Sequence, residues 1–318
     1  MACLNPIPAS REYLDDSIVL HSQSYWARQA DGEYLELACG RCGSCRQRNV
    51  RDWGIRSYHE SLTNLRHAPA TRDSPATQVS NNCFVTLTYE KMPPFGDLDL
   101  EHFQSFCNLL RKKYGPFRYL HCGEYGSTAY TARPHYHALL FGIDFHWDRV
   151  RLHDPDRPDR IAWVSPSLEK LWGRGRTEIG PLTYATAAYT AGYVVKKLRN
   201  AEWAEQHDQV DADGNVVRTK PPEYITMSRN PGLGTNWFLA NYTDVYKNDE
   251  VHIDGKTFQP PKFYDKLLKR TDPELFYDVQ QRREARRSLL KPTQPQELAA
   301  RKSNWEARFR QKAHRKAL

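Results

Sequence analysis

Two histidines one residue apart, His135 and His137, are the first residues of this sequence whose spacing suits a metal ion. They lie in RPHYHALLFG (133–142), where the apolar run predicts a β-strand. Side chains alternate between the two faces of a strand and rise ~3.3 Å per residue, so both imidazoles point the same way with Cα atoms ~6.6 Å apart. Taken alone, the pair favours paired or solvated histidines over a metal site.

A third ligand is offered by Glu124, in the strand expected for FRYLHCGEYG (117–126). The polar loop between the two strands predicts a β-hairpin, which brings the Glu124 carboxylate opposite the start of the histidine strand. Two imidazoles and one carboxylate leave coordination positions open, as a catalytic metal requires. His121 has the wrong parity to share this face with Glu124. His102, or a second acidic group, stays open as an alternative ligand.

Two tyrosines four residues apart lie in the helix expected for TYATAAYTAGYVVKKLRN (183–200). Tyr189 and Tyr193 then share one face with Cβ atoms ~5 to 6 Å apart, and Lys196 and Lys197 continue that stripe. The opposite stripe is expected to pack on a sheet: Ala188, Ala191, Val195 and Leu198. On their own, the tyrosines are more simply interpreted as core residues with hydroxyls at the edge.

Three cysteines at three-residue steps, Cys39, Cys42 and Cys45, lie in the Gly-rich turn CGRCGSC. Three thiolates at this spacing suit zinc or an iron–sulfur cluster, and a closed structural site needs a fourth ligand. Cys3 is the best candidate for that ligand. The other three cysteines fall inside expected strands or a helix, where they would pack: Cys83, Cys107 and Cys122. We expect a structural zinc that ties the N-terminus to the first helix, with incidental buried cysteines as the alternative.

The elements that must position these residues follow in the order strand, helix, strand, strand, helix. Strands are expected at 83–90, 117–126 and 135–142, and helices at 44–68, between Asp99 and Gly115, and at 183–200 with Thr183 as the cap. The start of the chain reads as irregular and 67–82 as an unusually long loop. This order indicates an α+β fold with a central antiparallel sheet and helices packed on it, not alternating βαβ units.

The charge of the chain is concentrated at one end. The 318 residues carry a formal net charge of +8. Residues 262–318 contain 16 Lys or Arg against 7 Asp or Glu, a balance of +9. Such a basic, partly helical extension suits a polyanion, or is a solvated helix. We expect three parts: an N-terminal segment with the Cys-rich turn and a helix (1–66), a central domain (83–245) and a basic tail (246–318).

Composition also bounds the class of protein. With 39% hydrophobic and 12% aromatic residues, the chain can bury a sizeable core. No stretch approaches the ~20 apolar residues of a membrane span, and the first residues lack the order of a signal peptide. Seven cysteines in a chain of this size favour reduced thiols or a metal over disulfides. We therefore expect a cytoplasmic protein without a membrane partner.

With these residues in this order, the sequence resembles the rolling-circle replication initiators of the HUH endonuclease superfamily, and within it the replication proteins of the Microviridae, gokushovirus branch. FVTLTY (84–89) resembles the first strand motif, GEYG with RPHYHALLFG the metal motif, and AYTAGYVVKK (188–197) the two-tyrosine motif. CGRCGSCRQRNVRDW (39–53), the ACLNP start and MSRNPGLG (227–234) resemble features of the phage group. The resemblance covers roughly residues 1–240 and not the basic tail.

The resemblance implies a fold similar to ferredoxin and RRM domains and a DNA-nicking enzyme. Tyr189 or Tyr193 would attack a phosphodiester at the viral origin, stay joined to the 5′ phosphate and leave a 3′ hydroxyl primer; the second tyrosine would later help to recircularise the displaced strand. Glu124, His135 and His137 would hold Mg²⁺ or Mn²⁺. Lys196 would lie near the phosphate or the phenolate, and Lys197 would contact the DNA phosphate.

The partners implied are single-stranded and supercoiled viral DNA at the origin, and the host helicase, polymerase and single-strand binding protein, in the cytoplasm of a bacterial host. Three alternatives stay open. One is a relaxase or single-strand transposase of the same superfamily. Another is a zinc-containing DNA-binding protein without catalysis. The last, a metal-dependent hydrolase of small substrates, is disfavoured by the basic tail and by the lack of further ligand motifs.

Overall fold

The computed structural model describes residues 3–12, 17–23, 30, 32–68, 77–126, 133–156, 158–196, 208–210, 213–289 and 295–317. Contacts divide the chain into two units, one made of Met1–Asn49 with Gln280–Leu318 and the other of Val50–Val279. These limits differ from the boundaries expected at 66, 83 and 245. Among the described helices, none combines the length and the apolar character that crossing a membrane requires.

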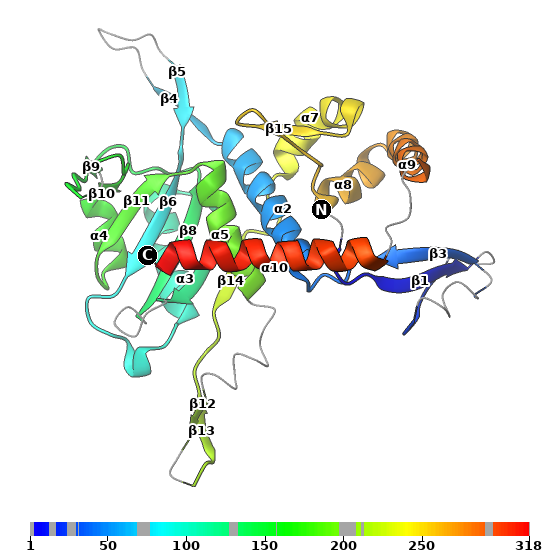
Figure 1. Ribbon diagram of the computed structural model, residues 1–318. Helices are drawn as coiled ribbons and strands as arrows, with labels where there is room; N and C mark the ends of the chain where they lie inside the picture. The colour runs from blue at the N-terminus through cyan, green and yellow to red at the C-terminus, as the bar shows by residue number, and fades with distance from the viewer. Residues whose placement is uncertain are drawn as a thin grey trace. The chain divides into compact units, whose positions relative to one another are not determined.

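A seven-stranded antiparallel sheet forms the centre of the second unit (Figure 1). Its strands, in spatial order, are β14 (Tyr224–Met227), β7 (Arg118–Tyr125), β8 (Pro134–Phe141), β6 (Asn82–Thr88), β11 (Thr177–Pro181), β10 (Trp163–Val164) and β9 (Val150–Arg151). The three strands predicted from the sequence are confirmed as β6, β7 and β8. They are adjacent and central, and the predicted α+β class with an antiparallel sheet is confirmed.

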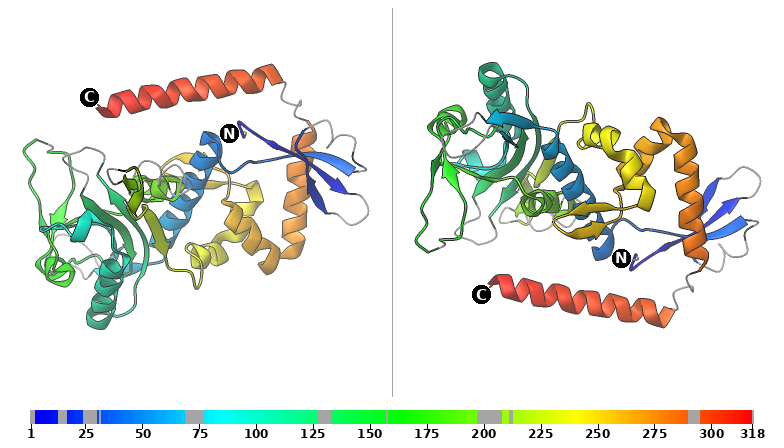
Figure 2. Two further views of the ribbon diagram at one scale, coloured as in Figure 1. Left: turned by 90° about the horizontal axis from the view of Figure 1, so that it is seen from below. Right: turned by 90° about the horizontal axis from the view of Figure 1, so that it is seen from above.

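Helices cover both faces of this sheet (Figure 2). On one face, α3 (Leu100–Tyr114) and α4 (Pro166–Trp172) pack with Phe103 and Trp172 against Val85 and Tyr136 of the sheet. On the other face, α5 (Tyr184–Lys196) packs with Ala187 near Leu139. Alternation along β8 therefore turns Tyr136 toward α3, and turns both histidines toward α5.

Local capping explains where the helices begin. The Asp99 carboxylate accepts a hydrogen bond from the Glu101 N–H at 2.8 Å at the start of α3, and Gly115, with φ 87°, ends that helix. Thr183 Oγ1 accepts from the Thr186 N–H at 3.2 Å at the start of α5. Both predicted caps are confirmed, because a short polar side chain satisfies an N–H that the first helical turn leaves without a partner.

A second core lies outside the sheet in the same unit. It is built around α2 (Gly43–Leu62), α7 (Thr235–Asn248), α8 (Lys262–Thr271), α9 (Pro273–Ser288) and the hairpin of β15 (Val251–Ile253) and β16 (Lys256–Phe258). Ile55, Phe238, Tyr246 and Tyr264 are fully buried there. Residues 246–279 therefore belong to a packed core, because α8 and β15 bury their apolar faces, whereas the sequence indicated a tail from 246 onward.

Several further elements differ from expectation. The irregular start predicted before the Cys-rich turn is wrong, since β1 (Ile7–Glu12), β2 (Ile18–Leu20) and β3 (Gly32–Leu37) form a sheet in the order β2-β1-β3. The long loop predicted at 67–82 contains a hairpin, β4 (Leu65–Ala68) with β5 (Thr77–Ser80). A further hairpin joins β12 (Asp208–Val210) and β13 (Val216–Thr219), Pro94–Gly96 form a short 3₁₀ turn, and α10 (Pro295–Ala317) makes the basic extension helical.

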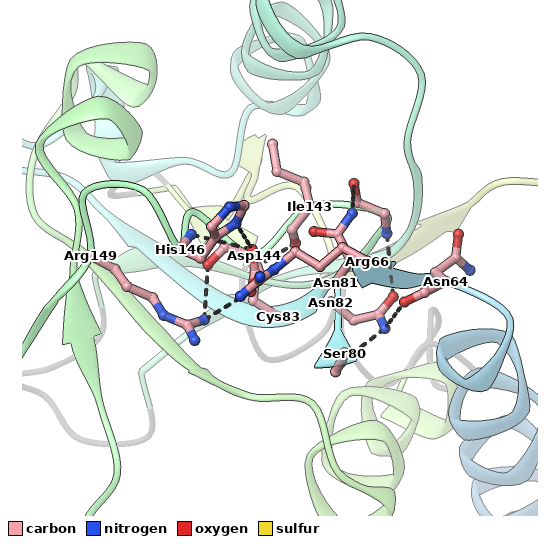
Figure 3. Close-up of polar contacts among 11 residues, drawn as sticks. Asn64, Arg66, Ser80, Asn81, Asn82, Cys83, Ile143, Asp144, His146 and Arg149 are labelled. Atoms are coloured by element: carbon pink, nitrogen blue, oxygen red, sulfur yellow. Dashed lines mark hydrogen bonds and ion pairs between the residues drawn. The ribbon is translucent and has the colours of Figure 1, made fainter. Parts of the chain in front are cut away.

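A polar cluster holds the base of the β4–β5 hairpin against the sheet (Figure 3). Asp144, only 1% exposed, lies 3.4 Å from Arg66 Nε and 3.4 Å from an Arg149 nitrogen. The buried Asn82 amide donates to the Ser61 and Asn64 carbonyls at 2.9 Å each, at the end of α2. Because Asn82 pairs with the last residue of β8, this cluster anchors the end of β8 opposite to the histidines.

The segment MSRNPGLG ties α2 to β7. The Glu60 carboxylate of α2, 2% exposed, lies 2.6 Å from Arg118 Nε of β7 and accepts from the Gly234 N–H at 2.7 Å. Arg118 also donates to the Pro231 carbonyl at 2.6 Å, and Arg56 donates to the Leu233 carbonyl at 3.1 Å. A buried carboxylate costs stability unless it is paired, so this loop supplies the partners that Glu60 requires.

Gly234 tests the importance of this junction. Its φ is +81°, and a Cβ there would lie 2.6 Å from Tyr264 Oη and 3.0 Å from the Arg56 carbonyl oxygen. We expect Gly234→Ala to lower the free energy of unfolding, measured by urea denaturation, by more than the roughly 1–2 kcal/mol of a left-handed residue alone. Gly255, with φ +70° and no atom within 4 Å of the position that a Cβ would take, is the control. Equal losses for Gly234→Ala and Gly255→Ala would contradict the packing argument.

Candidate metal centre and nucleophile helix

The three predicted metal ligands converge at one end of the sheet, on the face that α5 covers. Glu124 Oε1 lies 2.7 Å from His135 Nε2 and 2.9 Å from His137 Nε2. One ligand atom from each residue lies within 4.8 Å of the others. Strand register produces the cluster, because β7 and β8 pair with Glu124 directly opposite His135. The group is therefore held by two central strands and not by loops.

Hydrogen bonds on the far side of each ring set the orientation of the imidazoles. His135 Nδ1 lies 3.0 Å from the Arg133 carbonyl oxygen, which can only accept, so Nδ1 carries a proton. His137 Nδ1 lies 3.0 Å from Thr86 Oγ1. His135 Nε2 then turns a lone pair toward the Glu124 carboxylate unless a second proton or a cation lies there. Metal-bound histidines share this arrangement, with the other ring nitrogen bonded to a carbonyl or hydroxyl group.

The pKa directions of the two histidines agree with a site for positive charge. Burial would lower the pKa of His135, but its hydrogen bonds to Glu124 and to the Arg133 carbonyl raise it above the ordinary value. Burial lowers the pKa of His137, and the hydrogen bond to Glu124 offsets this only in part. One positive charge beside the carboxylate is thus favoured, and a proton or a metal ion can supply it.

The donor set is suited to a catalytic divalent ion. Two imidazole nitrogens and one carboxylate oxygen occupy three positions and leave the remainder for water or substrate. Mn²⁺ accepts imidazole ligands more readily than Mg²⁺, which prefers oxygen donors. The observed residues therefore fit the metal site that the sequence predicted, while the geometry by itself does not choose the ion.

The first tyrosine of α5 lies beside this group. The centroid of the Tyr189 ring lies 5.4 Å from that of His137 and 6.3 Å from that of Phe84. Tyr189 is 46% exposed, so a strand of nucleic acid can reach it. Tyr193 and Lys196 also belong to α5, but their side chains lie outside the described part of the structure, as does Lys197 altogether.

The buried face of α5 is rotated by about one residue from the predicted stripe. Ala187, Thr190 and Ala191 are fully buried. Ala188, predicted to face the sheet, instead faces α2, where a Cβ on Gly54 would lie 3.2 Å from it. Spacing alone cannot separate a contact with the sheet from one with a second helix. The predicted Val195 side chain and Leu198 lie outside the described residues.

Three residues near the ligands were not singled out by the sequence analysis. Thr86 bonds to His137, the Phe84 ring lies 5.3 Å from the His137 ring with planes 16° apart, and the charge of the buried Glu223 contributes to the raised pKa of His135. Strand parity would have found two of them, since Phe84 and Thr86 alternate in FVTLTY. Glu223 lies far along the chain, and nothing local indicates it.

The other histidines considered as ligands lie on the opposite face. His102 Nδ1 lies 2.6 Å from Tyr89 Oη, within the core that packs under α3. His121 stacks on Phe103 with ring centroids 3.4 Å apart, and burial holds its pKa well below the ordinary value. Neither residue shares the face of Glu124, so the alternative ligand His102 is not part of this cluster.

A second candidate metal site is formed by Cys3, Cys39, Cys42 and Cys45, with all four sulfur atoms within 4.8 Å of one another. Cys3 Sγ lies 3.5 Å from Cys39 Sγ and 3.7 Å from Cys42 Sγ. Burial would raise the pKa of Cys42, but hydrogen bonds from the Ser44 hydroxyl and from the Cys45 and Leu4 backbone lower it to about 5. The structure thus brings the predicted fourth cysteine to the other three.

Comparison with known proteins gives a consistent result. The family of the replication-associated protein ORF2 matches residues 82–198, which include every candidate metal ligand and tyrosine of the sheet site. The Replication-associated protein ORF2 of Spiroplasma virus 4 is 30% identical over 315 residues, covering 91% of this chain and 88% of that protein. The Replication-associated protein VP4 of Bdellovibrio phage phiMH2K is 27% identical over 287 residues, covering 86% and 79%. No solved structure matches. This chain belongs to the family of phage replication-associated proteins.

Proposed function

We propose that this protein initiates rolling-circle replication of a phage genome by nicking one strand of the viral DNA at its origin. The observation that carries the proposal is the position of Tyr189, whose ring lies 5.4 Å from His137 of the Glu124, His135 and His137 group. A phenol, a divalent ion and a phosphodiester are the components of a transesterification. The names of the relatives support a role in replication.

In the proposed reaction, the oxygen of Tyr189 or Tyr193 attacks a phosphorus atom of the DNA. A bond forms between the phenol oxygen and phosphorus, the bond to the 3′ oxygen breaks, the phenol loses its proton and the 3′ oxygen gains one. The 5′ phosphate stays on the tyrosine, and the 3′ hydroxyl primes synthesis. Because an ordinary tyrosine has a pKa of ~10, the attack needs help at neutral pH. Mg²⁺ or Mn²⁺ held by Glu124, His135 and His137 would polarise the phosphate and stabilise the developing charge.

The second tyrosine allows the displaced strand to be closed into a circle. While one tyrosine holds the 5′ phosphate, the other cleaves the regenerated origin, and the new 3′ hydroxyl attacks the first phosphotyrosine. The energy of the phosphodiester is kept in the covalent link, so no nucleotide is hydrolysed. Lys196 is proposed to lie near the phosphate or phenolate and Lys197 to contact the DNA, with roles that α5 would give them by helical spacing.

The proposed partners are single-stranded and supercoiled viral DNA at the origin, together with the host helicase, polymerase and single-strand binding protein in the bacterial cytoplasm. The four-cysteine site takes no part in the proposed chemistry, because four thiolates leave no position for substrate on a tetrahedral ion. The two sites are therefore assigned different tasks: one open and catalytic, the other closed and structural.

Substitution of the tyrosines tests the covalent step. We expect Tyr189→Phe and Tyr193→Phe each to impair circle closure, and the double variant to form no covalent adduct, because each phenol oxygen is a nucleophile in one of the two cleavages. The measurement is a denaturing gel of labelled single-stranded viral DNA incubated with protein and Mn²⁺. Tyr184→Phe in the same helix is the matched control and should keep full activity.

The same gel separates the proposal from its alternatives. An adduct that persists in the double variant would exclude these tyrosines as the nucleophiles. Tight binding of DNA without any adduct in the unaltered protein would favour a DNA-binding protein without catalysis. Adducts without circular product would favour a relaxase or single-strand transposase.

Removal of the metal ligands tests the role of the ion. We expect the double variant His135→Ala and His137→Ala to lose adduct formation, and Mn²⁺ affinity to fall by more than the ~10- to 100-fold typical for loss of an outer partner. Mn²⁺ binding is measured by electron paramagnetic resonance, and EDTA should abolish the adduct in the unaltered protein. His252→Ala, whose side chain is 65% exposed, is the control. An adduct that survives both EDTA and the double substitution would remove the metal from the mechanism.

Thr86 provides a finer test of the same site. Thr86→Val removes the hydroxyl that bonds to His137 Nδ1 while keeping the shape of the side chain, and we expect Mn²⁺ affinity to fall ~10- to 100-fold. Thr86→Ser keeps the hydroxyl and should retain most of the affinity. Identical Mn²⁺ titrations for the valine and serine variants would show that the hydroxyl does not orient the ligand.

A further inference from the structure

We propose that Cys3, Cys39, Cys42 and Cys45 bind one Zn²⁺ ion on which the folding of the N-terminal sheet depends, and that the turn so formed seats the basic helix α10 through Trp305. All of these residues lie in the unit made of Met1–Asn49 and Gln280–Leu318. The proposal is independent of the nicking reaction, since it concerns neither the tyrosines nor the ligands on the sheet.

The spacing of the sulfur atoms fits one tetrahedral ion. With Zn–S bonds of ~2.3 Å, the edges of a tetrahedron of thiolates are ~3.8 Å long. The observed separations of Cys3 Sγ from Cys39 Sγ and Cys42 Sγ are 3.5 and 3.7 Å. A disulfide needs ~2.0 Å between sulfurs, and all four cysteines are free thiols. An iron–sulfur cluster binds each thiolate to a different iron and so requires wider spacing.

Hydrogen-bond donors surround the four sulfur atoms. The backbone N–H of Leu4 donates to Cys42 Sγ at 3.4 Å, that of Cys39 to Cys3 Sγ at 3.3 Å, and that of Cys42 to Cys39 Sγ at 3.3 Å. Arg48 Nη2 lies 3.7 Å from Cys45 Sγ. Four thiolates around Zn²⁺ carry a net charge of −2, which these donors and the Arg48 cation stabilise. The surroundings of the sulfur atoms therefore suit thiolates bound to an ion.

The N-terminal sheet has too few apolar contacts to fold without such a link. In the described part of residues 3–42, the buried apolar side chains are Leu4, Ala9 and Leu35, while the three residues of β2 are exposed. The cysteines lie before β1, after β3 and at the start of α2, so one ion would join three points of the chain. Small domains with little core are stabilised by a metal in this way, and binding of the ion then drives folding.

The same turn contacts α10. Gly43 lies between Cys42 and Cys45, and a Cβ on it would collide with the ring of Trp305. Trp305 is only partly exposed, whereas most described side chains of α10 are exposed. This helix carries seven Lys or Arg residues and two Glu. A glycine in the Cys-rich turn therefore makes room for the aromatic anchor of a basic helix, and the position of that helix depends on the turn.

Metal analysis tests the first half of the proposal. Protein purified under reducing conditions with zinc present should contain one zinc per chain by mass spectrometry, and Co²⁺ in its place should give the visible absorption of a tetrahedral thiolate site. Cys42→Ser and Cys45→Ser should each lose the ion, while Cys107→Ala, a buried cysteine of α3, should keep it. No stoichiometric zinc, or iron with inorganic sulfide in its place, would overturn the assignment.

Hydrogen exchange tests the second half. In Cys42→Ser, the amides of β1 and β3 and of residues 295–307 should exchange faster, while β6, β7 and β8 keep their protection. Trp305→Ala and Gly43→Ala should retain zinc and the protection of β1 and β3, but release α10. Trp147→Ala, an exposed tryptophan elsewhere, is the matched control and should change neither. Unchanged exchange of β1 and β3 without zinc, or of α10 in both Trp305→Ala and Gly43→Ala, would overturn the proposal.

Discussion

The shared carboxylate of Glu124 is the interaction on which the candidate site depends. One oxygen faces both His135 Nε2 and His137 Nε2, at 2.7 and 2.9 Å. This is possible only because β7 and β8 are hydrogen-bonded neighbours with Glu124 opposite His135. A slip of one residue would turn Glu124 to the face of α3 and leave the histidines facing α5 alone. The register of one hairpin therefore decides whether the site exists.

The structure secures that register at several distant points. The cluster of Asp144, Arg66 and Asn82 holds the far end of β8, and the Glu60 and Arg118 pair holds β7 to α2. Each uses a buried polar group that is stable only with its partners in place. Apolar packing alone tolerates small shifts, whereas such groups do not. Polar contacts away from the metal ligands thus contribute to the precision of the site.

Strand parity and helix caps explain why much of the central fold could be predicted. Alternation in RPHYHALLFG placed His135 and His137 on one face, and Asp99 and Thr183 marked two helix starts. The N-terminal sheet was missed because IPASRE and GEYLEL are short and only weakly apolar. The face of α5 was misjudged because Ala188 meets α2, a contact between distant segments that no local pattern reveals.

The position of Tyr189 combines two demands that oppose each other. A nucleophile must be accessible to a DNA strand, while its geometry relative to the ion must be fixed to well under an ångström. Ala187, Thr190 and Ala191 bury one side of α5 completely, which fixes the helix, while Tyr189 stays 46% exposed beside His137. A loop would give access without rigidity, and a strand would bury the phenol. A helix packed by small residues satisfies both demands, and a second tyrosine one turn later can then use the same ion.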